Sequence, residues 1–134
     1  GHDNVPCVSV LWSTIIIPMK VLVIDDEEIV RKALARALSI NQHQVYMASG
    51  GVEGITLWEN HQPDVVLLDV LMPEMSGPKV LEKMQGHNAK VFLMSAFKGE
   101  YDTTTAKELG ADGFIPKPFE NVFDLIEKIE KLYG

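Results

Sequence analysis

Three aspartates stand directly after apolar runs, where they could together bind a divalent cation. Asp25 and Asp26 follow Val21–Ile24, and Asp69 follows Val65–Leu68. If both runs are strands of one parallel sheet, their carboxyl ends bring the three carboxylates to the same edge. Like charges at close range repel, so such a cluster either raises the pKa of a carboxyl group or holds a cation. Hard oxygen ligands with open positions suit Mg²⁺, which also bridges readily to phosphate.

A hydroxyl and an ammonium group follow two later apolar runs, in the way that the aspartates follow the earlier ones. Ser95 follows the apolar run Val91–Met94, and Lys117 follows the run Gly113–Ile115. Each feature alone has an ordinary explanation: the aspartate pair as a turn or helix N-cap, the serine as a turn residue, and the lysine as a surface ion-pair partner. Their coincidence at the ends of strands favours one shared polar site.

The sequence predicts the parallel sheet that this site requires. From Lys20 onward, short apolar runs bounded by turn residues alternate with segments of helical period, which is typical of repeated strand-helix units. The first, third and fourth runs are nearly continuously apolar, so we expect these strands at the centre of the sheet. The five predicted strands are Val21–Ile24, Gln44–Ala48, Val65–Leu68, Val91–Met94 and Gly113–Ile115.

Five segments between and after the strands carry apolar residues at every third or fourth position, as helices do. Right-handed crossovers would place these helices on both faces of the sheet. We therefore expect an α/β, doubly wound, three-layer sandwich whose ligands bind outside the carboxyl ends of the strands. The predicted helices are Ile29–Leu38, Val52–Asn60, Pro78–Gln85, Asp102–Leu109 and Val122–Ile129.

The composition is that of one acidic domain. The chain has 134 residues, of which 46% are hydrophobic, and 12 basic against 19 acidic residues give a net charge of −7. This balance argues against direct binding of nucleic acid. A single cysteine, Cys7, forms no internal disulfide, which fits a reducing cytoplasm. The longest apolar stretch, Val8–Ile17, falls short of the roughly 20 residues of a spanning helix, so we expect no membrane insertion.

The alternation of strand and helix begins at Met19. Residues 1–18 are therefore predicted to be an N-terminal appendage, from an expression tag or an upstream extension, and residues 19–134 the folded domain. The β-branched run Thr14–Ile17 has strand propensity and could pair with a sheet edge. The printed sequence stops just after the last predicted helix, so no output domain is expected within it.

Four motifs make the chain resemble the receiver domains of two-component response regulators, of the chemotaxis-regulator kind, from Lys20 to about Tyr133. The resemblance implies a flavodoxin-like fold with strand order 2-1-3-4-5. It also implies a bacterial, cytoplasmic signalling switch that catalyses only its own phosphorylation and dephosphorylation. The motifs are Val21–Glu27, Pro63–Pro73, Leu93–Ala96 and Gly110–Phe119.

By that resemblance Asp69 is the phosphoacceptor, and Ser95 and Lys117 contact the phosphoryl oxygens. A divalent cation and an ammonium group would stabilise the charge of the transferring phosphoryl group while the carboxylate attacks in line. The resemblance also implies a cis peptide bond between Lys117 and Pro118. The implied ligands of Mg²⁺ (or Mn²⁺) are Asp26, Asp69 and the backbone carbonyl of Leu71, and Asp25 would support the metal through water.

Ser95 and Phe114 match the switch pair of the family. On phosphorylation Ser95 would turn toward the phosphoryl group, and Phe114 could then move from an outward to a buried rotamer. The alternative is a ring buried in both states.

The implied phosphodonor is a sensor histidine kinase or a histidine phosphotransfer protein. A downstream effector or output domain would bind the surface that changes, and the resemblance also allows a homodimer. That surface comprises Lys98–Leu109, Phe114 and Phe119–Ile129.

Two positions that vary within the family hold bulky apolar residues here. Leu71 is the second residue after the phosphoacceptor, and Phe97 is the second after the hydroxyl residue. A hydrolytic water needs room and polar guidance, so these side chains predict slow autodephosphorylation.

Three other functions share parts of this pattern. A haloacid-dehalogenase-like phosphatase, which is Mg²⁺-dependent, needs a second aspartate where Leu71 stands. A flavin-binding module of the same fold would place the flavin phosphate against the acidic turn Asp25–Glu27, which would repel the phosphate rather than bind it. A degenerate receiver would act as an interaction domain without phosphorylation, but all the pocket residues of an active one are present.

Further residues are assigned structural roles. Trp58 is predicted to lie in the core, and the pairs Glu127-Lys128 and Glu130-Lys131 to form a solvated helix face. None of His43, His61 and His87 has the partnered spacing of a base or metal ligand.

Overall fold

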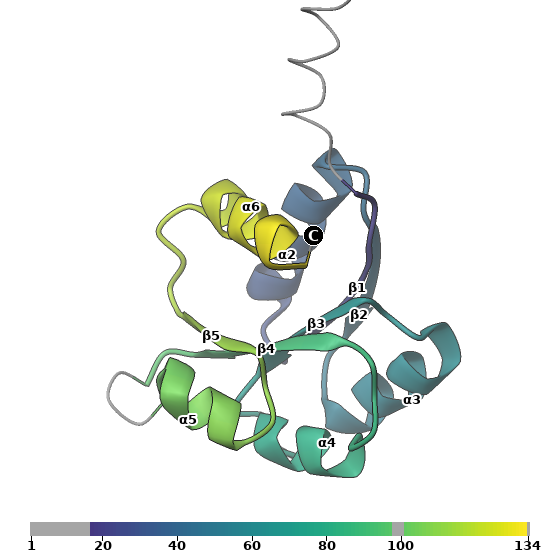
Figure 1. Cartoon of the computed structure of the whole chain (residues 1–134), viewed down its shortest axis with the longest axis vertical. Coiled ribbons are helices and arrows are strands. Elements are labelled where there is room, and N and C mark those ends of the chain that lie inside the picture. The colour runs from purple at the N-terminus through teal and green to yellow at the C-terminus, as the bar shows by residue number, and fades with distance from the viewer. Residues whose placement is uncertain (1–16, 98–100, 134) are drawn as a thin grey trace, which may run out of the picture.

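The computed structural model describes residues 17–97 and 101–133, which form alternating strands and helices (Figure 1). Most of the predicted appendage, including Thr14–Ile16, lies outside the described residues, as does Lys98. No helix in the described part is long and apolar enough to cross a membrane. The strands are β1 (Lys20–Ile24), β2 (Gln44–Ala48), β3 (Val65–Asp69), β4 (Lys90–Ser95) and β5 (Gly113–Pro116). The helices are α2 (Glu28–Ile40), α3 (Gly51–His61), α4 (Gly77–Lys83), α5 (Thr103–Glu108) and α6 (Val122–Tyr133).

The strands form one parallel sheet in the order β2-β1-β3-β4-β5, as expected, with β1, β3 and β4 in its interior. Helices α2 and α6 cover one face, and α3, α4 and α5 cover the other (Figure 1). Successive residues of a strand point to opposite faces, so each central strand contributes to both cores. In β3, for example, Val65 and Leu67 pack toward α2 and α6, whereas Val66 and Leu68 pack toward the other three helices.

The strand register aligns the carboxyl ends of four strands. Ile24 pairs with Leu68, and Asp69 pairs with Met94 one step further along the sheet. On the far side of β4, Ser95 pairs with Pro116. The residues at or just beyond these ends therefore arrive at one edge, as the positions of the polar residues in the sequence predicted.

A glycine allows the start of α4 to pack against the end of β3. A Cβ atom on Gly77 would lie 2.4 Å from the backbone oxygen of Asp69 and 3.1 Å from Cα of Val70. The amide of Gly77 donates to the carbonyl of Val70 at 2.8 Å. Ser76 caps the helix by accepting from the amide of Lys79, as N-cap serines do. The absence of a side chain at position 77 thus permits a tight turn beneath Asp69.

The observed boundaries differ slightly from the predicted ones, for backbone reasons. Strands β1, β3 and β5 each include one flanking residue and β4 includes two, because a hydrogen-bonded ladder continues past the apolar side chains. Helix α4 ends at Lys83 rather than Gln85, ahead of Gly86, whose φ of +90° is left-handed. Helix α6 continues past Ile129 to Tyr133.

One assignment on α6 is wrong. Glu130, predicted to be solvated, keeps only 13% of its side chain exposed and lies 2.6 Å from Nε2 of the buried His43. The other ring nitrogen, Nδ1, accepts from the amide of Met19 at 3.1 Å, and Asn41 donates to Glu130 at 3.0 Å. His43 therefore carries its proton on Nε2 when neutral, and it joins the beginning of β1 to α6. The buried position of Trp58 is confirmed.

Candidate functional site

The three aspartates of the predicted cluster lie together. Asp25, just beyond β1, and Asp69, the last residue of β3, are buried, whereas Asp26 is exposed. One carboxylate oxygen of each lies within 4.8 Å of the others. Ligand oxygens around Mg²⁺ stand at most about 4.2 Å apart, since each bond is about 2.1 Å long. Small side-chain adjustments would close this difference, so the three carboxylates fit a magnesium ion.

Lys117 enters this cluster from the end of β5. Its ammonium group is buried and lies 2.6 Å from Asp25 Oδ2, 3.3 Å from Asp69 Oδ1 and 3.3 Å from Glu27 Oε1. The amide of Lys117 donates to the carbonyl of Ser95 at 2.9 Å, which fixes its backbone to the end of β4. The peptide bond to Pro118 is cis, as expected. One cation thus faces several carboxylates, and the pocket keeps an excess of negative charge that a divalent cation would neutralise.

Burial and the neighbouring Asp25 charge raise the pKa of Asp69 to about 7, against an ordinary value of 3.8. The positive charge of Lys117 lowers it only in part. Burial lowers the pKa of Lys117, but the contacts with Asp25 and Asp69 outweigh this effect, and the net shift is upward. Near neutral pH the ammonium group is therefore charged, while Asp69 exchanges a proton readily in the absence of a cation.

Ser95 closes β4 at the same edge and is buried. Its hydroxyl oxygen accepts from the amide of Phe97 at 3.0 Å, so the loop after β4 holds it. Phe114 on β5 pairs with Leu93 on β4 and is half-buried against the core beneath α3, α4 and α5. Leu93 and Ser95 are two residues apart on one strand and share a face, so Ser95 and Phe114 face the same layer of helices.

Two apolar side chains stand on loops that leave this edge. Leu71, in the loop after β3, is 52% exposed, and Phe97, in the loop after β4, is 48% exposed. Both follow residues of the polar site by two positions. The role of the Leu71 carbonyl as a metal ligand stays a prediction.

Sequence reasoning missed three residues that support the site. Glu27 contacts Lys117, and its amide donates to Asp25 Oδ1 at 2.9 Å. Arg31 donates from Nη1 to the carbonyl oxygen of Asp25 at 2.7 Å. Gly77 packs on the backbone of Asp69. The position of Arg31 one helical turn after Glu27 gave a signal for the first two, whereas the role of Gly77 depends on a close backbone approach that spacing does not reveal.

Comparisons with known proteins agree on one family. A family model described as the response regulator receiver domain matches residues 21–130. Response regulator MprA of Mycobacterium sp. (strain KMS) is 36% identical over 104 residues, which are 76% of this chain and 45% of that protein. Response regulator MprA of Mycobacterium leprae (strain TN) is 32% identical over 116 residues, 85% of this chain and 50% of that protein. The chain thus spans about half the length of these relatives.

Solved structures share the fold over nearly the whole chain. The receiver domain of the Francisella response regulator 1452 superposes with a TM-score of 0.77 at 27% identity, covering 86% of this chain and 96% of that one. A chain of the CheX-CheY-BeF₃-Mg²⁺ complex from Borrelia burgdorferi superposes with a TM-score of 0.79 at 28% identity, covering 88% of this chain and 91% of that one.

Proposed function

The chain belongs to the response regulator receiver domain family, and on that premise we propose that it is the phosphoacceptor of a two-component His-Asp phosphorelay, switched by Mg²⁺-dependent phosphorylation of Asp69. One observation carries the proposal: Asp69 lies at the end of β3 with the Lys117 ammonium 3.3 Å away and two further carboxylates beside it. Membership of this family sets aside the phosphatase and flavin-binding interpretations. The degenerate receiver is the alternative that experiment must exclude.

Asp69 is the nucleophile in this proposal. Its ionised carboxylate forms a bond to phosphorus while the phosphorus-nitrogen bond of a phosphohistidine breaks, and the departing imidazole takes the electron pair and a proton from solvent. The product is an acyl phosphate on Asp69. Asp26, Asp69 and the Leu71 carbonyl would hold Mg²⁺, with Asp25 supporting it through water, and the ion would supply positive charge to the phosphoryl oxygens.

Lys117 and Asp25 act as a pair. Asp25 holds the ammonium group at 2.6 Å in a buried position, so Lys117 is charged and already near Asp69 before a donor arrives. The ammonium can then donate to a phosphoryl oxygen with a small displacement, which is the preorganised stabilisation that phosphoryl transfer requires. Arg31 fixes the backbone of Asp25 and thereby the position of this pair.

Ser95 supplies the switch. To bond the phosphoryl group its hydroxyl must leave the Phe97 amide, from which it now accepts at 3.0 Å. This exchange moves the loop after β4 and changes the space next to Phe114 in the same layer. A signal at Asp69 would thus reach the face formed by α5, β5 and α6, where we propose that an effector or output domain binds.

We propose a sensor histidine kinase or histidine phosphotransfer protein as the donor and the cytoplasm as the compartment. The chain catalyses only its own phosphorylation and dephosphorylation.

Intact mass after incubation with acetyl phosphate, with and without Mg²⁺, tests the proposal on the parent and on Asp69→Asn. We expect a metal-dependent gain of one phosphoryl group that the variant lacks. A folded, Mg²⁺-saturated parent that gains none from acetyl phosphate or from a phosphorylated histidine kinase would be a degenerate receiver.

A further inference from the structure

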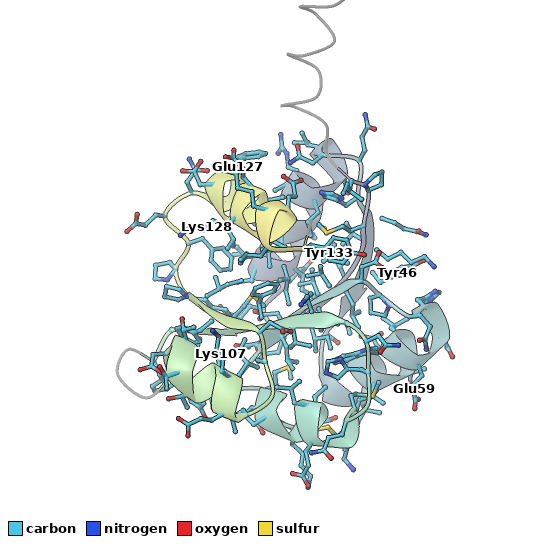
Figure 2. The ribbon with its side chains drawn as sticks, in the orientation of Figure 1. Tyr46, Glu59, Lys107, Glu127, Lys128 and Tyr133 are labelled. Carbon is cyan, nitrogen blue, oxygen red and sulfur yellow. The ribbon has the colours of Figure 1, made fainter. Side chains whose placement is uncertain are left out.

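Glu27 is an exposed glutamate whose side chain nevertheless lies against the pocket. It keeps 63% of its side chain exposed. An exposed glutamate is free to extend into water, as Glu59 on α3 does in Figure 2. The carboxylate of Glu27 instead accepts from the ammonium group of Lys117 at 3.3 Å. Glu27 therefore stands on the solvent side of a lysine whose own side chain is only 8% exposed.

The start of α2 fixes Glu27 in this place without using its carboxylate. Glu27 is the N-cap of α2, a position that favours the short side chains of serine, threonine, aspartate and asparagine, because these accept from a helix amide. The Glu27 side chain makes no such hydrogen bond. Its carbonyl accepts from the amide of Arg31 at 3.1 Å, and its amide donates to Asp25 Oδ1 at 2.9 Å. The backbone thus holds the residue, and the carboxylate is left for Lys117.

A phosphoryl group must displace one of the carboxylates around Lys117. An ammonium group has three N–H donors. Asp25 lies 2.6 Å from this one, and Asp69 and Glu27 each lie 3.3 Å from it. Asp25 is fully buried, so separating it from the cation would leave an unpaired buried charge, and Asp69 is the nucleophile. Glu27 can return to water at little cost, so it is the partner that a phosphoryl oxygen replaces.

The same carboxylate also acts on the donor before transfer. Among the carboxylates around Lys117, Glu27 is the exposed one, so a donor that approaches from solvent meets its negative charge. Like charges repel, and the repulsion grows with the charge of the donor. Acetyl phosphate is a dianion near neutral pH, whereas the nitrogen of phosphoramidate is protonated and offsets part of the phosphoryl charge. Glu27 therefore hinders the acyl phosphate more.

We propose that Glu27 sets the choice of phosphodonor, favouring phosphorus-nitrogen donors, the class of phosphohistidine and phosphoramidate, over anionic acyl phosphates. The inference rests on the proposed function, because it names the donor class for the phosphorylation of Asp69. Glu27 acts through Lys117 and through its own charge, so it is a positioning residue.

The two classes of donor differ in what leaves the phosphorus atom. In both, a carboxylate oxygen of Asp69 forms the new bond to phosphorus. In acetyl phosphate the phosphorus-oxygen bond breaks, and acetate leaves with the electron pair as an anion. In phosphoramidate the phosphorus-nitrogen bond breaks, and the protonated nitrogen takes the electron pair and leaves as neutral ammonia. An anionic leaving group departs past Glu27 less readily than a neutral one.

Substitutions at Glu27 and at its neighbour isolate this charge. Glu27→Gln removes the charge and keeps the shape of the side chain, whereas Glu27→Asp keeps the charge. The matched control is Glu28→Gln, which changes the net charge equally at a side chain that is 64% exposed and pairs with Lys32. Intact mass follows phosphorylation of the full chain in Mg²⁺, from acetyl phosphate and from phosphoramidate, at low and at high salt.

The ratio of the two rates is the measured quantity. Glu27→Gln should raise the rate with acetyl phosphate about three- to fivefold and the rate with phosphoramidate less than about twofold. High salt should reduce this difference, because salt screens exposed charges. Glu27→Asp and Glu28→Gln should both stay within about twofold of the parent with each donor.

A second readout needs neither donor nor metal. The ¹H-¹⁵N NMR signal of the Lys117 ammonium group, assigned by its loss in Lys117→Arg, reports directly on the contact with Glu27. We expect Glu27→Gln to shift this signal and Glu28→Gln to leave it in place. A signal that Glu27→Gln does not move would overturn the inference.

The kinetic results can overturn it as well. An unchanged or lower rate of Glu27→Gln with acetyl phosphate, an equal gain with both donors, or the same gain in Glu28→Gln would each do so. A Glu27→Asp variant that behaves like Glu27→Gln would assign the effect to shape instead of charge. If the parent is phosphorylated on Asp69, these results defeat only the choice of donor. A parent that gains no phosphoryl group from either donor or from a phosphorylated histidine kinase defeats the phosphoacceptor role, and the inference with it.

Discussion

The ammonium group of Lys117 lies closer to Asp25 than to Asp69, at 2.6 Å against 3.3 Å. Asp25 is fully buried, whereas Asp69 and Lys117 keep 5% and 7% of their surface exposed. Asp25 therefore raises the pKa of Asp69 in two ways. Its charge raises the pKa of Asp69 directly, and its hold on Lys117 draws away the cation that would lower it.

Replacing Asp25 should lower the pKa of Asp69. In Asp25→Asn the repulsive charge disappears and Lys117 is free to approach Asp69, although burial of the Asp69 carboxyl remains. A ¹³C-carboxyl NMR titration of the metal-free protein measures the shift. Asp26→Asn is the control: Asp26 contributes least among the neighbours of Asp69, so its change should be smaller. An unchanged pKa of Asp69 in Asp25→Asn would contradict both of these effects.

Binding of Mg²⁺ should weaken as the pH falls below 7. The pKa of Asp69 is raised to about 7, so below that pH the carboxyl group is increasingly protonated and a proton competes with the cation. Between pH 8 and pH 6 we expect about a tenfold loss of affinity, since each pH unit below the pKa costs up to about tenfold. Calorimetry in buffers of different ionisation enthalpy measures both the affinity and the proton released near pH 7. Equal affinity at both pH values would rule out Asp69 as a titrating ligand.

Metal-free protein should lose stability as the pH rises. The pKa of Asp69 is higher in the folded chain, about 7, than its ordinary value of 3.8. Such a group favours folding fully below 3.8, and that contribution disappears as the pH rises through 7. Asp69→Asn cannot ionise, so at pH 8 it should be more stable than the parent by about 1–2 kcal/mol after allowance for solvent screening. Urea unfolding at pH 4 and pH 8 checks this, and a variant no more stable than the parent at pH 8 would refute it.

A methyl group at position 77 should impair the site beyond its effect on stability. In Gly77→Ala the Cβ atom would lie 2.4 Å from the backbone oxygen of Asp69, so the end of β3 or the start of α4 must shift. Gly51→Ala is the matched control, because its Cβ would crowd Met75 at 2.9 Å and Val80 at 3.0 Å without touching Asp69. Both should lose about 1–3 kcal/mol of unfolding free energy.

The two glycine variants should separate in their chemistry. We expect Gly77→Ala to lose about tenfold in Mg²⁺ affinity and in the rate of phosphorylation from acetyl phosphate, because misplacement of reacting groups is costly. Gly51→Ala should retain both within about twofold. Equal losses in the two variants would reduce Gly77 to a packing role.

The phosphoryl group should persist on Asp69. Leu71 and Phe97 place bulky apolar side chains beside the site, where a hydrolytic water would need space and a polar partner. Leu71→Asn should shorten the lifetime of the acyl phosphate by about tenfold by offering that polar partner. The decay of the phosphorylated mass after removal of the donor measures it. A parent lifetime no longer than that of the variant would defeat this explanation.

Much of the site followed from the sequence because its residues lie at the ends of apolar strands. Asp25, Asp69, Ser95 and Lys117 come together through the register of a parallel sheet, and strand ends are readable from hydrophobic pattern. The fold class was predicted on the same basis, whereas the strand order was implied by the resemblance to the family.

The residues that were missed depend on contacts between distant segments. Glu130 looks solvated in its own helix, and only the packing of α6 beside α2 brings it to His43. Gly77 looks like an ordinary turn glycine until the turn is seen to press on the backbone of Asp69. Local pattern describes which face of an element is apolar, but it does not describe what a neighbouring element places against it.

Alternation along the strands divides the interior into two cores that share no side chains. A change of volume in one core meets the hydrogen-bonded backbone of β1, β3 and β4 before it can reach the other core. At β5 this barrier ends, because within residues 17–97 and 101–133 the strand has a neighbour on one side only. Phe114 and Ile115 lie next to each other there, one in each core. The margin of the sheet is therefore where a rearrangement in the layer of Ser95 can pass to the layer of α6.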